Sequence, residues 1–158
     1  MGTLPQLIEE DILHLNEVLK EFLSQTDATT AIVTDKGGFV ITHQGKSDGF
    51  DLTTIGALAS GAFMANQTIA GLVNEPNFSS IHQQGENFSI YCCNVDEQVM
   101  LIIIFRCHVG VVKYFVASVV KKIATQLEAA RRRAPDQGID LSVLNVANPQ
   151  EVFRKKEA

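Results

Sequence analysis

The chain has 158 residues, of which 46% are hydrophobic and 20% charged, a balance that is typical of one folded domain and excludes global disorder. Its net charge of −5 argues against nucleic acid and anionic membrane surfaces as primary partners. Three cysteines, Cys92, Cys93 and Cys107, lack the spacing of a disulfide framework and indicate a reducing, cytoplasmic environment.

The chain begins with a predicted amphipathic helix over residues 3–23, where apolar side chains recur at helical spacing. Thr3 and Gln6 have the spacing of a capping box, which predicts that the helix starts there. Two strands are predicted next, over residues 28–35 and 39–43. The Asp-Lys-Gly-Gly turn between them predicts a hairpin.

A second helix is predicted over residues 51–74, with Asp51 as its N-terminal cap. Three strand candidates follow, over residues 78–83, 87–94 and 99–105. The last of these, VMLIIIF, is apolar at every position, which is typical of a central strand covered on both faces.

The last predicted helix covers residues 110–133. The order helix, two strands, helix, three strands, helix predicts an α+β fold (an α/β sandwich). In this fold one five-stranded, mostly antiparallel sheet has helices on both faces. We expect a domain over residues 1–134 and a C-terminal tail over residues 135–158.

The second helix is unusual because residues 52–74 contain no Asp, Glu, Lys or Arg. Its length permits a membrane span, but Asn66, Gln67 and Thr68 would then lie unpaired in lipid. No Lys or Arg flanks the segment directly to anchor it at a membrane surface. The segment is therefore interpreted as a helix between protein surfaces, and no membrane span is predicted.

A helical projection divides this segment into two opposed, uncharged faces. We expect one face to pack on the sheet, through Ile55, Ala59, Ala62, Ile69 and Val73. A surface helix normally carries charges on its second face, so the absence of charge predicts a protein neighbour outside the domain. Small residues at Ala57, Gly61 and Ala65 would let that neighbour approach closely. The alternative is a helix buried wholly within its own domain.

Few residues suit catalysis. The Gly-Lys-Ser at residues 45–47 resembles the end of a phosphate-binding loop, but Val40 replaces the first glycine. Cys92 and Cys93 should point to opposite faces of a strand, and the histidines lack metal-ligand spacing. We expect no catalytic residues, no cofactor and no metal. The three arginines at residues 131–133 are interpreted as a solvated helix end, with a phosphate or acidic protein contact as the alternative.

The order of the motifs DKGGFVIT, TTIGALASGAFMAN, HQQGENFSIYCC and VMLIIIF resembles the Roadblock/dynein light chain superfamily over about residues 7–133. Within it, the chain is most similar to the bacterial branch that acts with Ras-like GTPases of the MglA type. The resemblance implies a homodimer formed through the middle helix and the following strand. It also implies that the paired helices meet a small GTPase in its GTP state and stimulate hydrolysis by reorganising the GTPase's own catalytic residues.

Carried onto this sequence, the resemblance implies a regulator of bacterial cell polarity or motility, located in the cytoplasm and expected to concentrate at a cell pole. Two alternatives stay open: a scaffold that binds a GTPase or polarity protein without accelerating hydrolysis, and a small-molecule sensor domain. The expected contacts lie in three places. These are the partner or dimer interface (Ala57, Ser60, Gly61, Met64, Ala65, Thr68, Leu72), the dimer-edge strand (Phe78, Ser80, His82) and the tail (Leu141, Leu144, Val152, Phe153).

Overall fold

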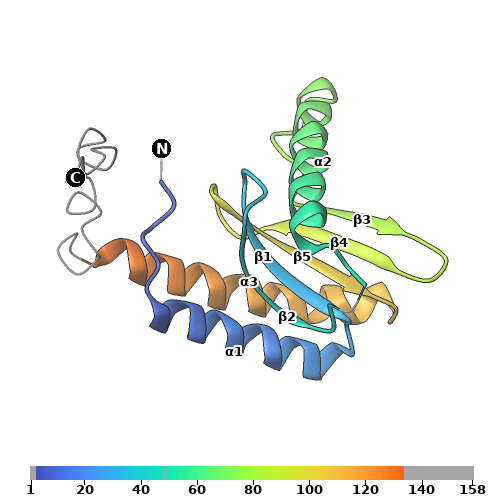
Figure 1. Ribbon diagram of the computed structural model, residues 1–158. Coiled ribbons are helices and arrows are strands. Elements are labelled where there is room, and N and C mark those ends of the chain that lie inside the picture. Colours follow the sequence, from blue (N-terminus) through green and yellow to red (C-terminus); the bar gives the residue numbers. More distant parts are fainter. Residues whose placement is uncertain (1–2, 48, 134–158) are drawn as a thin grey trace, which may run out of the picture.

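The computed structural model describes residues 3–47 and 49–133 (Figure 1). The expected tail contacts at Leu141, Leu144, Val152 and Phe153 lie outside the described residues. The predicted number, type and order of elements are confirmed. The elements are α1 (Glu9–Thr26), β1 (Thr30–Asp35), β2 (Val40–Gly45), α2 (Leu52–Leu72), β3 (Ser80–Gln84), β4 (Ser89–Asn94), β5 (Val99–Phe105) and α3 (Val109–Arg132).

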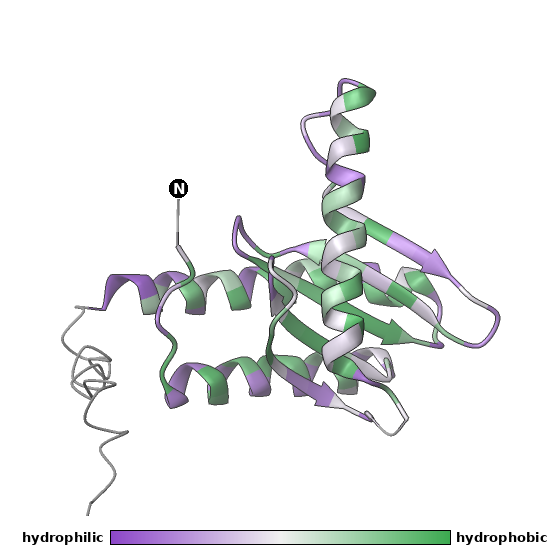
Figure 2. Cartoon of the chain, turned by 45° about the horizontal axis from the view of Figure 1, so that its top comes forward, coloured by the Kyte–Doolittle hydropathy of each residue, from purple (hydrophilic) through white to green (hydrophobic). Residues whose placement is uncertain are grey.

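The five strands form one antiparallel sheet in the order β2-β1-β5-β4-β3. β5 is central and buried at every position, as its continuous apolar sequence predicts. β2 and β3 are the two edge strands. α1 and α3 lie side by side on one face of the sheet, and α2 stands on the other (Figures 1 and 2). The predicted sheet with helices on both faces is confirmed.

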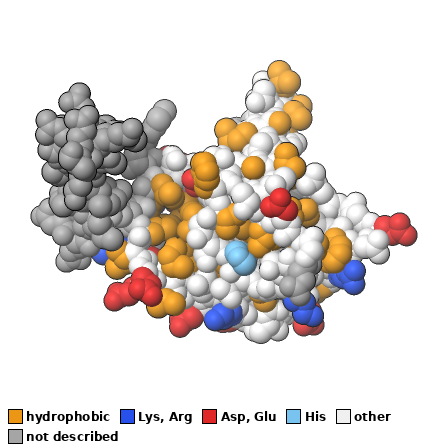
Figure 3. Space-filling view, viewed as in Figure 1, with side chains coloured by type: hydrophobic (Ala, Val, Ile, Leu, Met, Phe, Trp, Pro, Cys, Tyr) orange, Lys and Arg blue, Asp and Glu red, His pale blue; other side chains and the backbone are white. Residues whose placement is uncertain are grey.

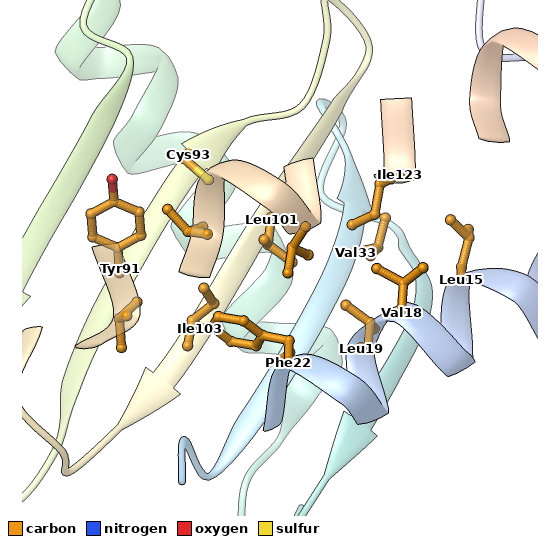
Figure 4. Close-up of a cluster of buried hydrophobic side chains, with 14 of the residues drawn as sticks. Leu15, Val18, Leu19, Phe22, Val33, Tyr91, Cys93, Leu101, Ile103 and Ile123 are labelled. Atoms are coloured by element: carbon orange, nitrogen blue, oxygen red, sulfur yellow. The ribbon is translucent and has the colours of Figure 1, made fainter. Parts of the chain in front are cut away.

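Each face of the sheet has its own hydrophobic core. The larger core lies under α1 and α3, where Leu101 and Ile103 of β5 meet side chains such as Phe22 and Ile123 (Figure 4). The smaller core lies under α2 and is centred on Phe63. Successive β5 side chains alternate between the two cores because neighbouring residues of a strand point to opposite faces. Cys92 and Cys93 divide between the cores in the same way, as predicted.

The start of α1 differs from the prediction. The helix begins at Glu9, and its cap is the Asp11 carboxylate, which accepts a hydrogen bond from Ile8 N at 2.8 Å. The capping role expected of Thr3 and Gln6 was therefore wrong. Asp11 takes that role because its carboxylate is also bound by α3 from outside the helix. At α2 the predicted cap is confirmed, since Asp51 Oδ1 accepts from Thr54 N at 3.1 Å.

Candidate partner interface

α2 (Leu52–Leu72) rests on the sheet mainly through its first half, and its C-terminal half projects beyond the sheet (Figures 1 and 2). Its buried positions are Gly56, Ser60, Phe63 and Ala70. Among the described residues, no helix is both long enough and apolar enough to span a membrane. Because few of its residues are buried, much of this uncharged helix faces outward.

The inward face of α2 agrees with the prediction in part: Ile55 and Ala59 pack against the smaller core as expected, but the other three predicted residues do not. Ile69 and Val73, expected to face the sheet, are 48% and 60% exposed. Ala62, expected on the same face, is exposed as well. The helix approaches the β1–β2 turn so closely that a Cβ on Gly56 would lie 3.0 Å from Gly38 O. Small residues take the inner positions beside the turn because branched ones do not fit there.

Ser60 also belongs to this inner face, which corrects its expected place in the interface. Its side chain is buried, with 3% of the residue exposed, and its Oγ donates to the backbone oxygen of Lys36. The hydroxyl docks α2 onto the hairpin turn and is not available to a partner.

The outward face of α2 is exposed where the sequence predicted a neighbour. Every other residue expected in the α2 interface is exposed: Ala57, Gly61, Met64, Ala65, Thr68 and Leu72. The structure adds Leu58, which is 70% exposed, together with Ile69 and Val73. Figure 3 shows hydrophobic side chains along the projecting helix with few charges beside them. Exposed apolar side chains gathered on one helix are typical of interaction sites, so this face is the candidate interface.

The β1–β2 turn contributes Phe39, a residue that the sequence analysis did not include in the site. Its side chain is 75% exposed. Its backbone is fixed, because Phe39 N donates to Asp35 Oδ1 at 2.9 Å and Gly38 N donates to Asp35 O at 3.1 Å. The sequence DKGGF has an aromatic residue directly after a tight turn, which could have drawn attention to Phe39. Only the fold shows that this turn lies beside α2.

The sequence profile of the Roadblock/LC7 domain family matches residues 14–105, from α1 to β5. The chain belongs to the Roadblock/LC7 family. No curated protein sequence matches it. The family match confirms the resemblance to the Roadblock/dynein light chain superfamily that the motifs indicated.

Solved structures of MglB proteins have the same fold. The gliding protein MglB from Thermus thermophilus is 27% identical, with a TM-score of 0.74, over 82% of this chain and 99% of that chain. An MglB with a tetrameric arrangement is also 27% identical over the same shares, with a TM-score of 0.76. Myxococcus xanthus MglB, at 24% identity over 82% of this chain and 98% of that chain, has a TM-score of 0.75 and shares the fold.

β3 is an edge strand of the Roadblock sheet, so one side of its backbone has no strand partner among the described residues. Of the three expected edge residues, Phe78 precedes β3. The amide of Gln67 on α2 holds its backbone, donating to Phe78 O at 2.7 Å and accepting from Phe78 N at 3.2 Å. Ser80 and His82 lie within β3, and the His82 ring stacks on Phe105 at 5.8 Å.

Two thiols of the Roadblock domain are buried, and two of its C-terminal arginines pair with carboxylates of the same domain. Burial raises the pKa of the Cys92 and Cys93 thiols to about 12, so neither forms a nucleophilic thiolate at neutral pH. Arg131 pairs with Asp96 at 2.7 Å, and Arg133 pairs with the buried Asp11. The prediction of a solvated helix end was therefore wrong for Arg131 and Arg133. Within residues 3–47 and 49–133, no cluster of three or more potential ligands could hold a metal ion.

Proposed function

We propose that this Roadblock protein is a homodimeric regulator of a Ras-like small GTPase of the MglA type and that it accelerates GTP hydrolysis. The observation that carries the proposal is the exposed, charge-free outer face of α2. The similarity to MglB structures supports it, because one of those proteins is a gliding protein and another has a tetrameric arrangement. The setting that fits is a cytoplasmic system of bacterial polarity or motility.

A regulator with this surface needs no nucleophile of its own. GTP hydrolysis depends on the positions of the water, the magnesium ion and the catalytic side chains that the GTPase already holds. An uncharged face with small residues at Ala57, Gly61 and Ala65 lets switch segments approach the α2 backbone closely. Met64 and Leu72 supply exposed apolar area for binding. The proposed activity is therefore one of shape and positioning.

A second copy of the chain would also pair with the open edge of the sheet at β3, next to α2. β3 is an edge strand, and such an edge is a template for pairing with another chain. In a two-fold dimer the same surface serves both partners, so α2 and β3 of each copy would meet their counterparts. Such a dimer would form a platform from two α2 helices.

The direct test combines the purified protein with the MglA-type GTPase of the same organism and follows phosphate release. We expect faster hydrolysis, and tighter binding of the GTPase when it holds a non-hydrolysable GTP analogue than when it holds GDP. Binding without acceleration would favour the scaffold alternative. The proposal would be refuted by the absence of both acceleration and nucleotide-dependent binding.

A substitution on α2 tests whether the outer face carries the activity. Gly61→Arg leaves the isolated fold intact, because a Cβ at Gly61 meets no heavy atom within 4 Å. We expect it to abolish GTPase binding or dimerisation, since it puts a charge and a long side chain on an apolar contact. The matched control is Ala117→Arg, at an exposed small residue of α3 on the opposite side of the sheet. Unchanged binding by Gly61→Arg would show that this face is not the interface.

A further inference from the structure

We propose that a groove along the C-terminal turns of α3 holds a segment of this chain's own tail, residues 136–144. The segment combines two acids with branched apolar residues, and the groove offers an unpaired lysine beside small side chains. Leu141 and Leu144, expected from the sequence to contact a partner, are then held on the chain's own domain. The inference is independent of the proposed function, because α3 and α2 lie on opposite faces of the sheet.

The α3 groove has a volume of about 590 Å³ and lies next to the β4–β5 turn. Small side chains of α3 line it, namely Ala124, Thr125 and Ala129. α1 packs along a different side of α3, where Lys122 pairs with Glu21 at 2.8 Å. The elements that the structure describes therefore leave the groove open to an occupant.

The charges of the α3 groove favour an acidic occupant. Three basic and two acidic side chains line the groove, a surplus of one positive charge. Asp96 pairs with Arg131 at 2.7 Å, and Glu128 lies 3.6 Å from Arg131 and 3.4 Å from Arg132. Both acids are thus paired, while the Lys121 ammonium has no acidic partner within the described part of the chain. A carboxylate entering the groove would pair with Lys121.

The first half of the tail has the complementary charge and begins where α3 and its groove end. Residues 134–150 contain Asp136 and Asp140 but no Lys or Arg. Pro135 and Gly138 favour turns, which the chain needs in order to reverse its direction and run back along the helix. The same stretch carries the apolar side chains that small groove residues accommodate.

The length of the chain decides which tail residue meets Lys121. From Arg133 back to Lys121, the helix measures about 18 Å at about 1.5 Å per residue. An extended chain covers about 3.3 Å per residue, so the segment from Arg133 to Asp140 spans up to about 23 Å. Asp140 can therefore reach Lys121, with Ile139 and Leu141 beside the small residues. Because the segment is tethered to α3, its binding is intramolecular and weak contacts suffice.

The test measures how fast each lysine of the full chain is acetylated by a water-soluble reagent, with peptide mass spectrometry as the readout. The double variant Asp140→Asn, Leu141→Ser removes the charge and an apolar side chain from the segment. We expect Lys121 to react at least about 3-fold faster in this variant, since a segment docked about two thirds of the time protects the lysine to that extent. Lys113, exposed on α3 outside the groove, should react equally in both proteins.

The matched control is Glu151→Gln, Val152→Ser, which changes an acid and the apolar residue after it farther along the tail and should leave Lys121 protected. All four substitutions lie after α3, so the packed elements stay intact. Equal acetylation of Lys121 in the unmodified chain and the Asp140 variant would overturn the proposal, as would equal deprotection by the control. Protection that is lost on dilution would assign the segment to another copy and would also overturn it.

Discussion

Asp11 joins the first turn of α1 to the last turns of α3, and its replacement by Asn tests how much that junction stabilises the domain. The residue is fully buried. Its carboxylate accepts hydrogen bonds from Ile8 N at 2.8 Å, Gln126 Nε2 at 2.7 Å and Arg133 Nη1 at 2.8 Å. The Arg133 guanidinium is the largest cause of a pKa lowered from 3.8 to about 2, while burial opposes the shift.

The pKa sets the size of the effect. A carboxyl whose pKa falls from 3.8 to about 2 on folding stabilises the folded state at neutral pH by about 2.5 kcal/mol, since one pKa unit corresponds to about 1.4 kcal/mol. That contribution is fully present well above pH 3.8 and is lost as the pH falls toward 2. The Arg133 side chain remains 25% exposed, so water partly solvates its charge when the partner is removed. We therefore expect Asp11→Asn to cost about 2–3 kcal/mol at pH 7, below the usual loss for a fully buried pair.

Urea unfolding at pH 7, 5 and 3 measures this, with the protein concentration held constant because association adds to stability. The free energy difference between Asp11→Asn and the unmodified chain should be largest at pH 7 and shrink between pH 5 and pH 3. The control is Glu9→Gln, an exposed acid in the same helical turn, which should cost no more than about 1 kcal/mol. A difference at pH 7 that matches the control, or one that does not shrink in acid, would refute the reasoning.

Two further predictions concern the hairpin turn and the thiols. Gly38→Ala should lower the free energy of unfolding by more than about 2 kcal/mol, because Gly38 has a φ of +90° and the added Cβ meets the α2 backbone. Gly49→Ala, with a φ of +83° but open space, should cost only about 1 kcal/mol in the same urea titration. In a thiol titration of the native protein at pH 8, Cys107 should react while Cys92 and Cys93 stay protected by burial. More than one fast thiol per chain, or a fast thiol in Cys107→Ser, would contradict this.

The element order could be predicted from the sequence because its signals are local. The Gly-Gly turn, the Asp51 cap and the apolar run of β5 each involve neighbouring residues, and the structure confirms all three. The same was true of the opposite orientation of Cys92 and Cys93, which follows from strand geometry alone. The α1 cap could not be predicted in this way, since Asp11 is held by Arg133, which lies 122 positions later in the chain.

The orientation of α2 shows where local information ends. The sequence by itself predicted a helix without charges within residues 52–74, and the structure places it at Leu52–Leu72. That a protein neighbour covers its second face stays a prediction. The sequence did not determine which side faces the sheet, because both faces are uncharged and the hydropathy pattern does not distinguish them. The close approach of Gly38 to Gly56 decided that question, by admitting Ser60 inward and leaving Ile69 outward. Only the tertiary structure could place Phe39 beside that helix, since contacts between distant segments depend on packing and leave no local pattern.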